Sequence, residues 1–365
     1  MRKINYCIPN KAMVVTSEEY VKERKSNIKL AVNAVGNKRE SLNFKFSGYV
    51  NNKDIIRYLI GGCCAYCGDK ITQHTPVVEH YRPKNRLTYR KNEFIINNGR
   101  YDKRNKSTVK SLYGYFLWGS HYKNLLPACR PCNTGEAKKF GVYINGRLEY
   151  GIPYGKDDLF PVLKSKSKVD PLYVKSIKNE YPLIFNPYKD NPNELFSYKV
   201  CEFYDDGFIV IRPNKNLSRR KRLKAQISIN VLGLNRQPLC EARWEIQNSV
   251  NSVLKSLIYD IQNSNYDIDN FVGYSNTLSK INNNGKGKLL GYSKLVSKKA
   301  VKLLHKTLRE NLNKYSKSIL TDTSSFNEKV FELEQFYTTR RKVDNKKNKL
   351  NKELQAIANE MLRHT

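Results

Sequence analysis

The chain has 365 residues, of which 66 are lysine or arginine and 33 are aspartate or glutamate, so its formal net charge is +33. It contains no apolar run of about 18 residues and no long apolar segment near its basic N-terminus, which argues against a transmembrane helix and a signal peptide and predicts a cytoplasmic location. An AT-rich genome would explain the many Lys, Asn, Ile and Tyr residues, but not a twofold excess of basic over acidic side chains. The charge favours a nucleic-acid partner over an acidic protein or simple solubility.

The N-terminal region, residues 1–60, is predicted to be helical. Thr16 and Glu19 have capping-box spacing, and residues 16–35 contain no glycine or proline, which favours a helix there. A second helix is expected at 52–60, because the two glycines that follow can adopt the left-handed conformation that ends helices.

Residues 61–150 carry two cysteine pairs and a short predicted strand. The stretch TPVVEHYRP, residues 75–83, reads as a strand that stops at Pro83. Residues 85–111 are polar and strongly basic, and we expect them to form an exposed insertion. A helix is expected to start just after the second cysteine pair.

The two remaining regions differ in pattern. Residues 151–240 alternate turn signals with short apolar runs such as GFIVIRP, which predicts strands and loops, and they contain the basic cluster RRKRLK at 219–224. Apolar residues then recur at helical spacing through 246–261, and residues 241–365 are expected to form basic helices. Together these patterns predict an α+β fold.

Four of the eight cysteines form two CxxC pairs, Cys64 with Cys67 and Cys129 with Cys132. In a reducing compartment such pairs indicate a metal site before a disulfide, and two of them supply the four thiolates of a closed, tetrahedral zinc site. Cys63 could shift the first pair by one position, and ordinary buried or redox thiols are the alternative interpretation. The segment between the pairs is longer than in a compact zinc ribbon, which implies an inserted substructure.

Glu79 and His80 lie in that inserted segment. A structural zinc site does not need them, but phosphodiester hydrolysis needs a base with a pKa near neutrality and a divalent ion on a hard oxygen ligand. Adjacent strand residues point to opposite faces, so the pair can reach a common centre only at a strand end or bend. Asn124 and Asn133, in NLLPACRPCN, are candidates for holding the imidazole and completing the metal shell.

These motifs resemble those of HNH endonucleases of the ββα-metal type. VEHYRPK is followed by NLLPACRPCN with CxxC pairs around them, as in that family. MRKI, IGGCCAYCGDKIT, GYFLW, YPLIFNPYKDNPNE and VLGLNRQPL, scattered over residues 1–245, are similar to its PtuB-like branch in Septu-type and retron-associated antiphage defence systems. The resemblance implies a ββα-metal HNH nuclease core with a four-cysteine zinc site, flanked by helical N-terminal and C-terminal regions.

The resemblance also implies roles for single residues. Glu79 and Asn133 would bind the catalytic Mg²⁺ or Mn²⁺, His80 would be the general base, and Asn124 would orient the histidine and brace the ββ hairpin. The side chains suited to contact phosphate groups are Arg82, Lys84, Lys138, Lys139, Arg219, Arg220 and Arg222. The alternative, non-functional interpretations are a helix cap for Asn133 and a solvated face for the RRKRLK cluster. His74 and His121 are expected to lie outside the site chemistry.

The resemblance implies a nuclease acting on DNA, or on RNA including tRNA, as the effector of a defence system. Its partner would be an ABC-type, PtuA-like ATPase, and a retron reverse transcriptase with its DNA is a further candidate. The sequence contains no GxxxxGK[ST] motif, so an ATPase would be a separate chain. The alternative is a non-catalytic, zinc-stabilised nucleic-acid-binding or scaffold subunit, which would not require Glu79, His80 or Asn133.

Two stretches depart from the family pattern. The segment between the last asparagine, Asn133, and the Phe-Pro at 160–161 is longer than expected, and residues 85–111 are unusually basic. The region beyond about residue 245 has no matching motif. These stretches are expected to set the substrate or the partner.

Overall fold

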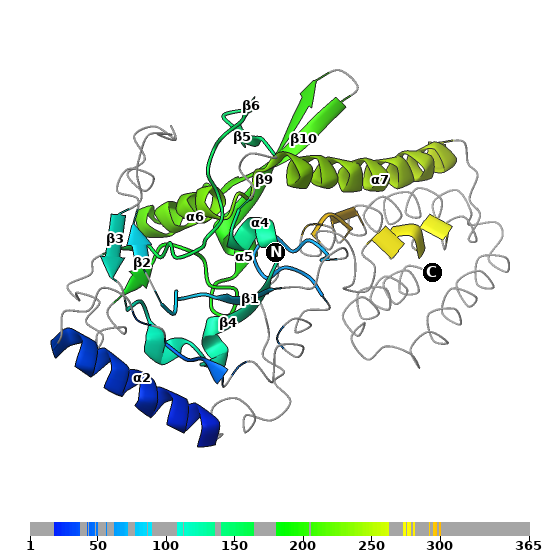
Figure 1. The fold of residues 1–365 in the computed structure, drawn as a ribbon. Helices are drawn as coiled ribbons and strands as arrows, with labels where there is room; N and C mark the ends of the chain where they lie inside the picture. Colours follow the sequence, from blue (N-terminus) through cyan, green and yellow to red (C-terminus); the bar gives the residue numbers. More distant parts are fainter. Residues whose placement is uncertain are drawn as a thin grey trace. The chain divides into compact units, whose positions relative to one another are not determined.

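The computed structural model describes most of the chain up to residue 262 and scattered positions from there to residue 300. The described residues are 18–36, 42, 44–47, 49, 56, 62–71, 77–85, 87–89, 108–111, 113–135, 140–163, 180–203, 206–262, 273, 274, 276–278, 280, 281, 292, 295–297, 299 and 300. The chain divides into two compact units, 1–249 with 281–295, and 250–280 with 296–365. The cysteine pairs, Glu79 and His80 belong to the first unit. Figure 1 shows the helices and strands of the described residues.

The helix expected at 16–35 is present as α2 (Glu18–Gly36). Its inner face buries Ala31 together with the polar residues Glu23 and Asn27. The Asn27 amide donates to the carbonyl oxygen of Lys45 at 2.7 Å and accepts from the Lys45 backbone N–H at 3.1 Å. The Glu23 carboxylate accepts from Oγ of Ser120 at 2.6 Å. These buried bonds fasten α2 to two segments that lie beside the candidate site.

A small aromatic core fills the space under α2. Phe44 stacks on Phe116 of the short helix η2 (Phe116–Trp118), with 4.6 Å between ring centroids, and both rings pack with Ala31 and Phe46. The helix expected at 52–60 lies outside the described residues apart from Ile56, which is buried.

The strand expected at 75–83 is β1 (Val77–His80), which pairs antiparallel with β4 (Leu125–Ala128). Glu79 lies opposite Leu126 and His80 opposite Leu125. β1 is exposed at its start and buried at its end, whereas β4 is buried throughout. Between β1 and β4 in the sequence, β2 (Leu87–Tyr89) pairs antiparallel with β3 (Thr108–Ser111). These two strands lie near the two ends of the basic insertion, residues 85–111.

The helix expected after the second cysteine pair begins earlier than predicted, so that prediction was wrong. α4 spans Arg130–Asn133 and contains Cys132, with Cys129 as its N-cap. Pro131 suits the first turn, where a backbone N–H has no helical partner. The helix ends at once because Gly135, with φ of +83°, turns the chain away.

The region 151–240 consists of strands and loops, as expected, but it also contains a helix over the basic cluster. Its elements are β7 (Val162–Leu163), β8 (Tyr181–Pro182), α5 (Pro192–Leu195), β9 (Phe196–Phe203), β10 (Asp206–Pro213) and α6 (Arg219–Val231). The strands β9 and β10 form a long hairpin, and β7 pairs with β8. Just before this region, β5 (Val142–Ile144) and β6 (Arg147–Glu149) form a second hairpin.

The helix expected from about residue 240 is α7 (Gln237–Gln262), which runs through the predicted 240/241 boundary. The later helices predicted within 241–365 fall largely outside the described residues. No helix of the described part of the chain is both long and apolar enough to cross a membrane. The described residues therefore form an α+β fold built from helices and separate antiparallel strand pairs.

A substitution at Gly119 would test how tightly the aromatic core packs beside His80. A Cβ atom on Gly119 would lie 2.0 Å from Cε1 of Phe46, whose ring centroid is 6.4 Å from that of His80. We expect Gly119→Ala to lower the free energy of unfolding, measured in urea, by about 1–3 kcal/mol because overpacking forces Phe46 to move. Gly273→Ala is the control, since a methyl group there meets nothing within 4 Å. Equal losses in the two variants would contradict the tight fit.

Candidate active site and metal centre

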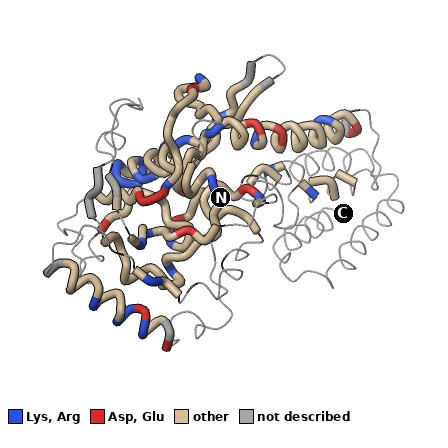
Figure 2. The backbone as a smooth tube through the Cα atoms, viewed as in Figure 1, with Lys and Arg blue, Asp and Glu red and all other residues tan. Residues whose placement is uncertain are grey.

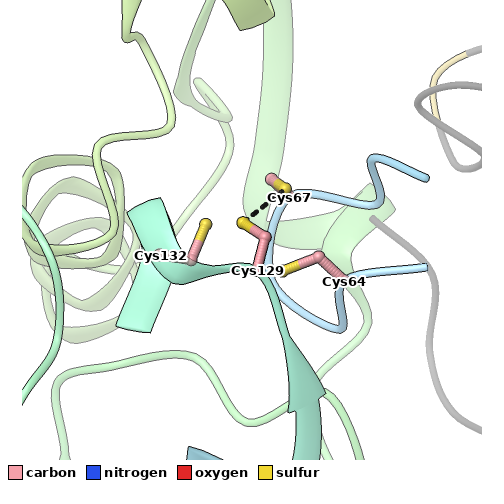
Figure 3. A group of neighbouring side chains, drawn as sticks. All are labelled: Cys64, Cys67, Cys129 and Cys132. Atoms are coloured by element: carbon pink, nitrogen blue, oxygen red, sulfur yellow. Dashed lines mark hydrogen bonds between the residues drawn. The ribbon is translucent and has the colours of Figure 1, made fainter. Parts of the chain in front are cut away.

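The two cysteine pairs meet at one point. Cys64 and Cys67 lie in the turn 62–71, Cys129 and Cys132 lie at α4, and all four Sγ atoms are within 4.8 Å of one another (Figure 3). The Sγ atoms of Cys67 and Cys129 are 3.8 Å apart. A tetrahedron with zinc–sulfur bonds of about 2.3 Å has edges of roughly 3.8 Å, so the donor set fits zinc in both chemistry and spacing.

Backbone hydrogen bonds hold both turns in shape. The carbonyl oxygen of Cys64 accepts from Gly68 N–H at 2.9 Å, and the carbonyl oxygen of Cys129 accepts from Asn133 N–H at 3.0 Å. Ala65 N–H donates to the carbonyl oxygen of Pro127 at 2.8 Å, which ties the first turn to β4. Cys63 is buried outside the cluster, so the register predicted from the CxxC spacing is confirmed.

The electrostatics of the cluster favour a bound cation. Burial raises the pKa of the Cys64 and Cys132 thiols, because thiolates crowded in a low-dielectric interior are costly. Hydrogen bonds from the neighbouring thiols, followed by the charge of Arg236, lower the pKa of Cys67. A zinc ion would replace the thiol protons and relieve this crowding.

Arg236 is a partner of the cluster that sequence reasoning missed. Its guanidinium is buried, with Nη1 3.4 Å from Sγ of Cys132 and Nη2 3.6 Å from Sγ of both Cys67 and Cys129. It also donates to the carbonyl oxygen of Gly233 at 3.1 Å, at the turn between α6 and α7. The motif VLGLNRQPL contains this arginine, but nothing in the sequence links it to cysteines that lie far away along the chain.

Glu79 and His80 lie side by side at the buried end of β1. The His80 ring makes a hydrogen bond to the backbone of Gly119, whereas its Nε2 is buried and has no hydrogen-bond partner. The bonded nitrogen is therefore Nδ1. Burial, followed by the positive charges of Lys84 and Lys156, lowers the pKa of His80 well below the ordinary value, so the ring is neutral at pH 7.

Aromatic side chains cover the imidazole. The ring of Tyr49 meets that of His80 edge-on at 5.1 Å, and Phe46 lies beside it. Nζ of Lys84 lies 4.6 Å from the Phe46 ring centroid and donates to the Tyr49 hydroxyl at 2.8 Å. Lys84, predicted to contact phosphate, is thus close to His80 and only half-buried.

Asn124 braces the segment that follows β1. Its buried side chain accepts from Arg82 N–H at 2.7 Å and donates to the carbonyl oxygens of Arg82 and Trp118, each at 3.0 Å. Its own carbonyl oxygen accepts from Tyr81 N–H at 2.8 Å. These bonds fix the backbone just past His80, on the same hairpin, which agrees with the bracing role expected of Asn124.

Glu79 faces a cation that the sequence did not predict. Its Oε1 is 2.6 Å from Nζ of Lys156, and both side chains are buried. Burial raises the pKa of Glu79, while Lys156 acts in the opposite direction. A carboxylate oxygen suits Mg²⁺ or Mn²⁺, so Glu79 fits the predicted ligand role.

Asn133, the second expected ligand, is the last residue of α4, and Asp157 N–H donates to its carbonyl oxygen at 2.6 Å.

The predicted phosphate contacts lie in different settings. Arg82 is buried, paired with Glu180, and lies over the rings of Tyr115 and Phe160, so its guanidinium is engaged by the protein. Arg219, Arg220 and Arg222 are exposed at the start of α6. Lys138, Lys139 and His74 lie outside the described residues. His121 is the N-cap of the short helix η3 (Tyr122–Asn124), where its Nδ1 accepts from Lys123 N–H at 3.2 Å.

Zinc removal should unfold the core of the first unit. Cys132→Ser replaces one buried donor, and we expect it to abolish stoichiometric zinc and to lower the melting temperature sharply, because structural zinc contributes folding energy directly. Zinc content by mass spectrometry and thermal unfolding are the measurements. Cys63→Ser, next to the cluster but outside it, is the matched control and should keep its zinc. Full zinc content in Cys132→Ser would contradict the assignment.

Arg236 should stabilise the zinc-bound cluster through its charge. We expect Arg236→Met to speed zinc transfer to a chromogenic chelator about 10- to 100-fold, the usual range for losing a residue that supports metal ligands. Arg243→Met is the control, because Arg243 is equally buried but contacts the Ile209 and Leu234 carbonyl oxygens and Cys240. It should destabilise the fold without changing zinc release. The same release rate in both variants would exclude a specific role for Arg236.

Comparison with known proteins gives no identification. No protein-family model, curated protein or solved structure matches the chain. The HNH resemblance stays a prediction from the sequence motifs.

Proposed function

We propose that this protein is a metal-dependent endonuclease of the HNH type that hydrolyses phosphodiester bonds in nucleic acid. The observation that carries the proposal is the state of His80. One of its ring nitrogens is held by the backbone of Gly119, the other has no hydrogen-bond partner, and a carboxylate is the adjacent residue. A histidine that only supported the fold would be expected to use both nitrogens when buried.

In this proposal His80 is the general base. Because its pKa is lowered by burial and by nearby positive charge, Nε2 carries a lone pair at neutral pH. The bond through Nδ1 fixes the tautomer and the orientation of the ring. Nε2 is then able to accept a proton from a water molecule that attacks phosphorus. Asn124 contributes by fixing the backbone that follows His80.

Glu79 and Asn133 would hold the catalytic Mg²⁺ or Mn²⁺. When bound, such an ion stabilises the negative charge that builds up on the phosphate and on the leaving oxygen. The four-cysteine cluster joins the turn 62–71 to α4, which carries Asn133 and follows β4, the partner strand of β1. The zinc site would thus be structural, and the ion at Glu79 catalytic.

The charge distribution supports a nucleic-acid substrate. Arg219, Arg220, Lys221 and Arg222 occupy the first turn of α6, where Figure 2 shows basic residues gathered. Positive side chains at a helix N-terminus oppose the helix dipole, so this position is not explained by helix stability. Exposed cations there are suited to phosphate contacts without base specificity. The chemistry does not use the 2′-hydroxyl, so DNA and RNA, including tRNA, both remain substrates of the proposal.

The biological setting proposed is antiphage defence. It rests on the motif resemblance to the PtuB-like proteins of Septu and retron systems. An ABC-type, PtuA-like ATPase would then control the nuclease, and a retron reverse transcriptase with its DNA is a further candidate partner.

A non-catalytic, zinc-stabilised nucleic-acid-binding subunit is the second candidate. One observation favours it: Nε2 of His80 is buried and the Glu79 carboxylate is paired with a lysine, so the acid–histidine pair is closed to solvent in this conformation. Binding through exposed basic residues would not require that pair to open.

Cleavage assays with His80→Ala separate the two functions. Wild type should degrade supercoiled plasmid or total RNA in Mg²⁺ or Mn²⁺, assayed alone and with a candidate ATPase. His80→Ala should lose activity by about 10²- to 10⁴-fold, the usual contribution of a general base, while its zinc content and nucleic-acid affinity stay unchanged. His121→Ala, at a histidine outside the centre, should cleave normally. Normal cleavage by His80→Ala would refute the role of the base, and tight binding without cleavage in every protein would favour the binding subunit.

A further inference from the structure

Lys156 is the charged group in the centre that the proposed reaction leaves without a role. Its side chain is 0 % exposed, and its Nζ lies 2.6 Å from Oε1 of Glu79. We propose that Lys156 is a positioning residue that holds the Glu79 carboxylate in place and occupies the position that the divalent cation takes. Loading the centre would then exchange an ammonium for a metal ion. This inference rests on the proposed function, in which Glu79 is a metal ligand.

The fold brings Lys156 to the centre by backbone bonds. Lys156 N–H donates to the carbonyl oxygen of Cys132 at 2.9 Å, Asp157 N–H donates to that of Asn133, and Gly155 N–H donates to that of Val231 at 2.7 Å. The segment that carries Lys156 is therefore fixed against α4 and the end of α6. Two of these bonds are accepted by α4, at Cys132 and at the predicted metal ligand Asn133. The helix α4 therefore positions the segment that carries Lys156.

Two glycines allow this close approach. Gly135 and Gly155 have φ values of +83° and +105°, and a Cβ on Gly155 would lie 2.4 Å from the backbone nitrogen of Gly135. The hairpin of β5 and β6 lies between these two glycines in the sequence, and its two ends meet where their backbones touch. The backbone next to Lys156 therefore lies close to that of Asn133, although the hairpin separates the two residues in sequence.

The energetics suggest a chemical reason for the pair. Burying two opposite charges is costly, and a well-packed apolar pair of similar volume is often as stable. Nζ of Lys156 also donates to the carbonyl oxygen of Asp157 at 3.0 Å, which gives the ammonium a second fixed partner. A buried ionic pair beside an imidazole whose Nε2 has no hydrogen-bond partner is more readily explained by chemistry at the site than by stability.

The exchange follows from simple electrostatics. An ammonium and a divalent cation that share one carboxylate repel each other strongly at a separation of a few ångströms. The metal ion can bind tightly only when the flexible lysine side chain moves away from Glu79. Lys156 would therefore fix the position of the Glu79 carboxylate when no metal ion is bound. It would also raise the metal concentration needed to fill the site.

Mn²⁺ binding to zinc-loaded protein, followed by electron paramagnetic resonance, tests the exchange directly. Lys156→Gln keeps a hydrogen-bond donor but removes the charge, and we expect it to bind Mn²⁺ at least about tenfold more tightly than wild type. Lys156→Arg keeps the charge and should bind as weakly as wild type. Glu79→Gln should abolish this binding in either background. Lys224→Gln is the matched control, because Lys224 is another buried lysine paired with an acid, Asp190, outside the centre.

The outcomes separate this inference from the proposed function. Equal or weaker Mn²⁺ binding by Lys156→Gln, with its zinc content intact, would overturn the exchange even if His80-dependent cleavage is present. Tighter binding by Lys156→Gln without any His80-dependent cleavage would keep the exchange at Glu79 and remove the nuclease. Should Lys156→Gln fail to retain zinc, Lys156→Met, which is also uncharged and of similar length, takes its place in the same titration.

Discussion

The four-cysteine cluster is the constraint on which the rest of the first unit depends. It joins the turn 62–71 to α4 and, through the buried guanidinium of Arg236, to the connection between α6 and α7. β4, the partner strand of β1, runs directly into Cys129, and Ala65 N–H of the turn 62–71 donates to the carbonyl oxygen of Pro127 in β4. A core with modest apolar content and a large excess of positive charge would gain from a metal ion at this cluster, because ligation would contribute folding energy against the repulsion between like charges.

The candidate centre is held from two sides with different chemistry. On the metal side, rigid turns fix α4 and the Lys156 segment. On the other side, the rings of Phe46 and Tyr49 lie against His80 and Lys84 contacts both rings, while α2 behind them is fastened by hydrogen bonds of Asn27 and Glu23. A ligand would approach more easily past Phe46 and Tyr49, because their dispersion contacts with the imidazole are easier to rearrange than the backbone bonds of the two cysteine turns.

The sequence predicted those parts of the site that depend on local spacing. The meeting of the CxxC pairs and the presence of a strand within residues 75–83 could be predicted because each follows from the pattern of neighbouring residues, although the strand ends at His80 and not at Pro83. Arg236 and Lys156 could not be predicted, since their roles arise from long-range placement: one is brought by the α6–α7 turn, the other by a hairpin that returns the chain to Asn133. The start of α4 was predicted wrongly because Pro131 was not given its weight as a first-turn residue.

The meeting of Gly135 and Gly155 bears on how the chain could change in length. The chain leaves and returns at nearly one point, but the β5–β6 hairpin is also tied to the connection that carries Arg236, because Tyr143 N–H donates to the carbonyl oxygen of Asn235 at 2.9 Å. The entropic cost of closing such an excursion grows only slowly with its length. Residues added at the tip of the hairpin, between Ile144 and Arg147, would therefore cost little chain entropy while the base of the hairpin keeps its bonds.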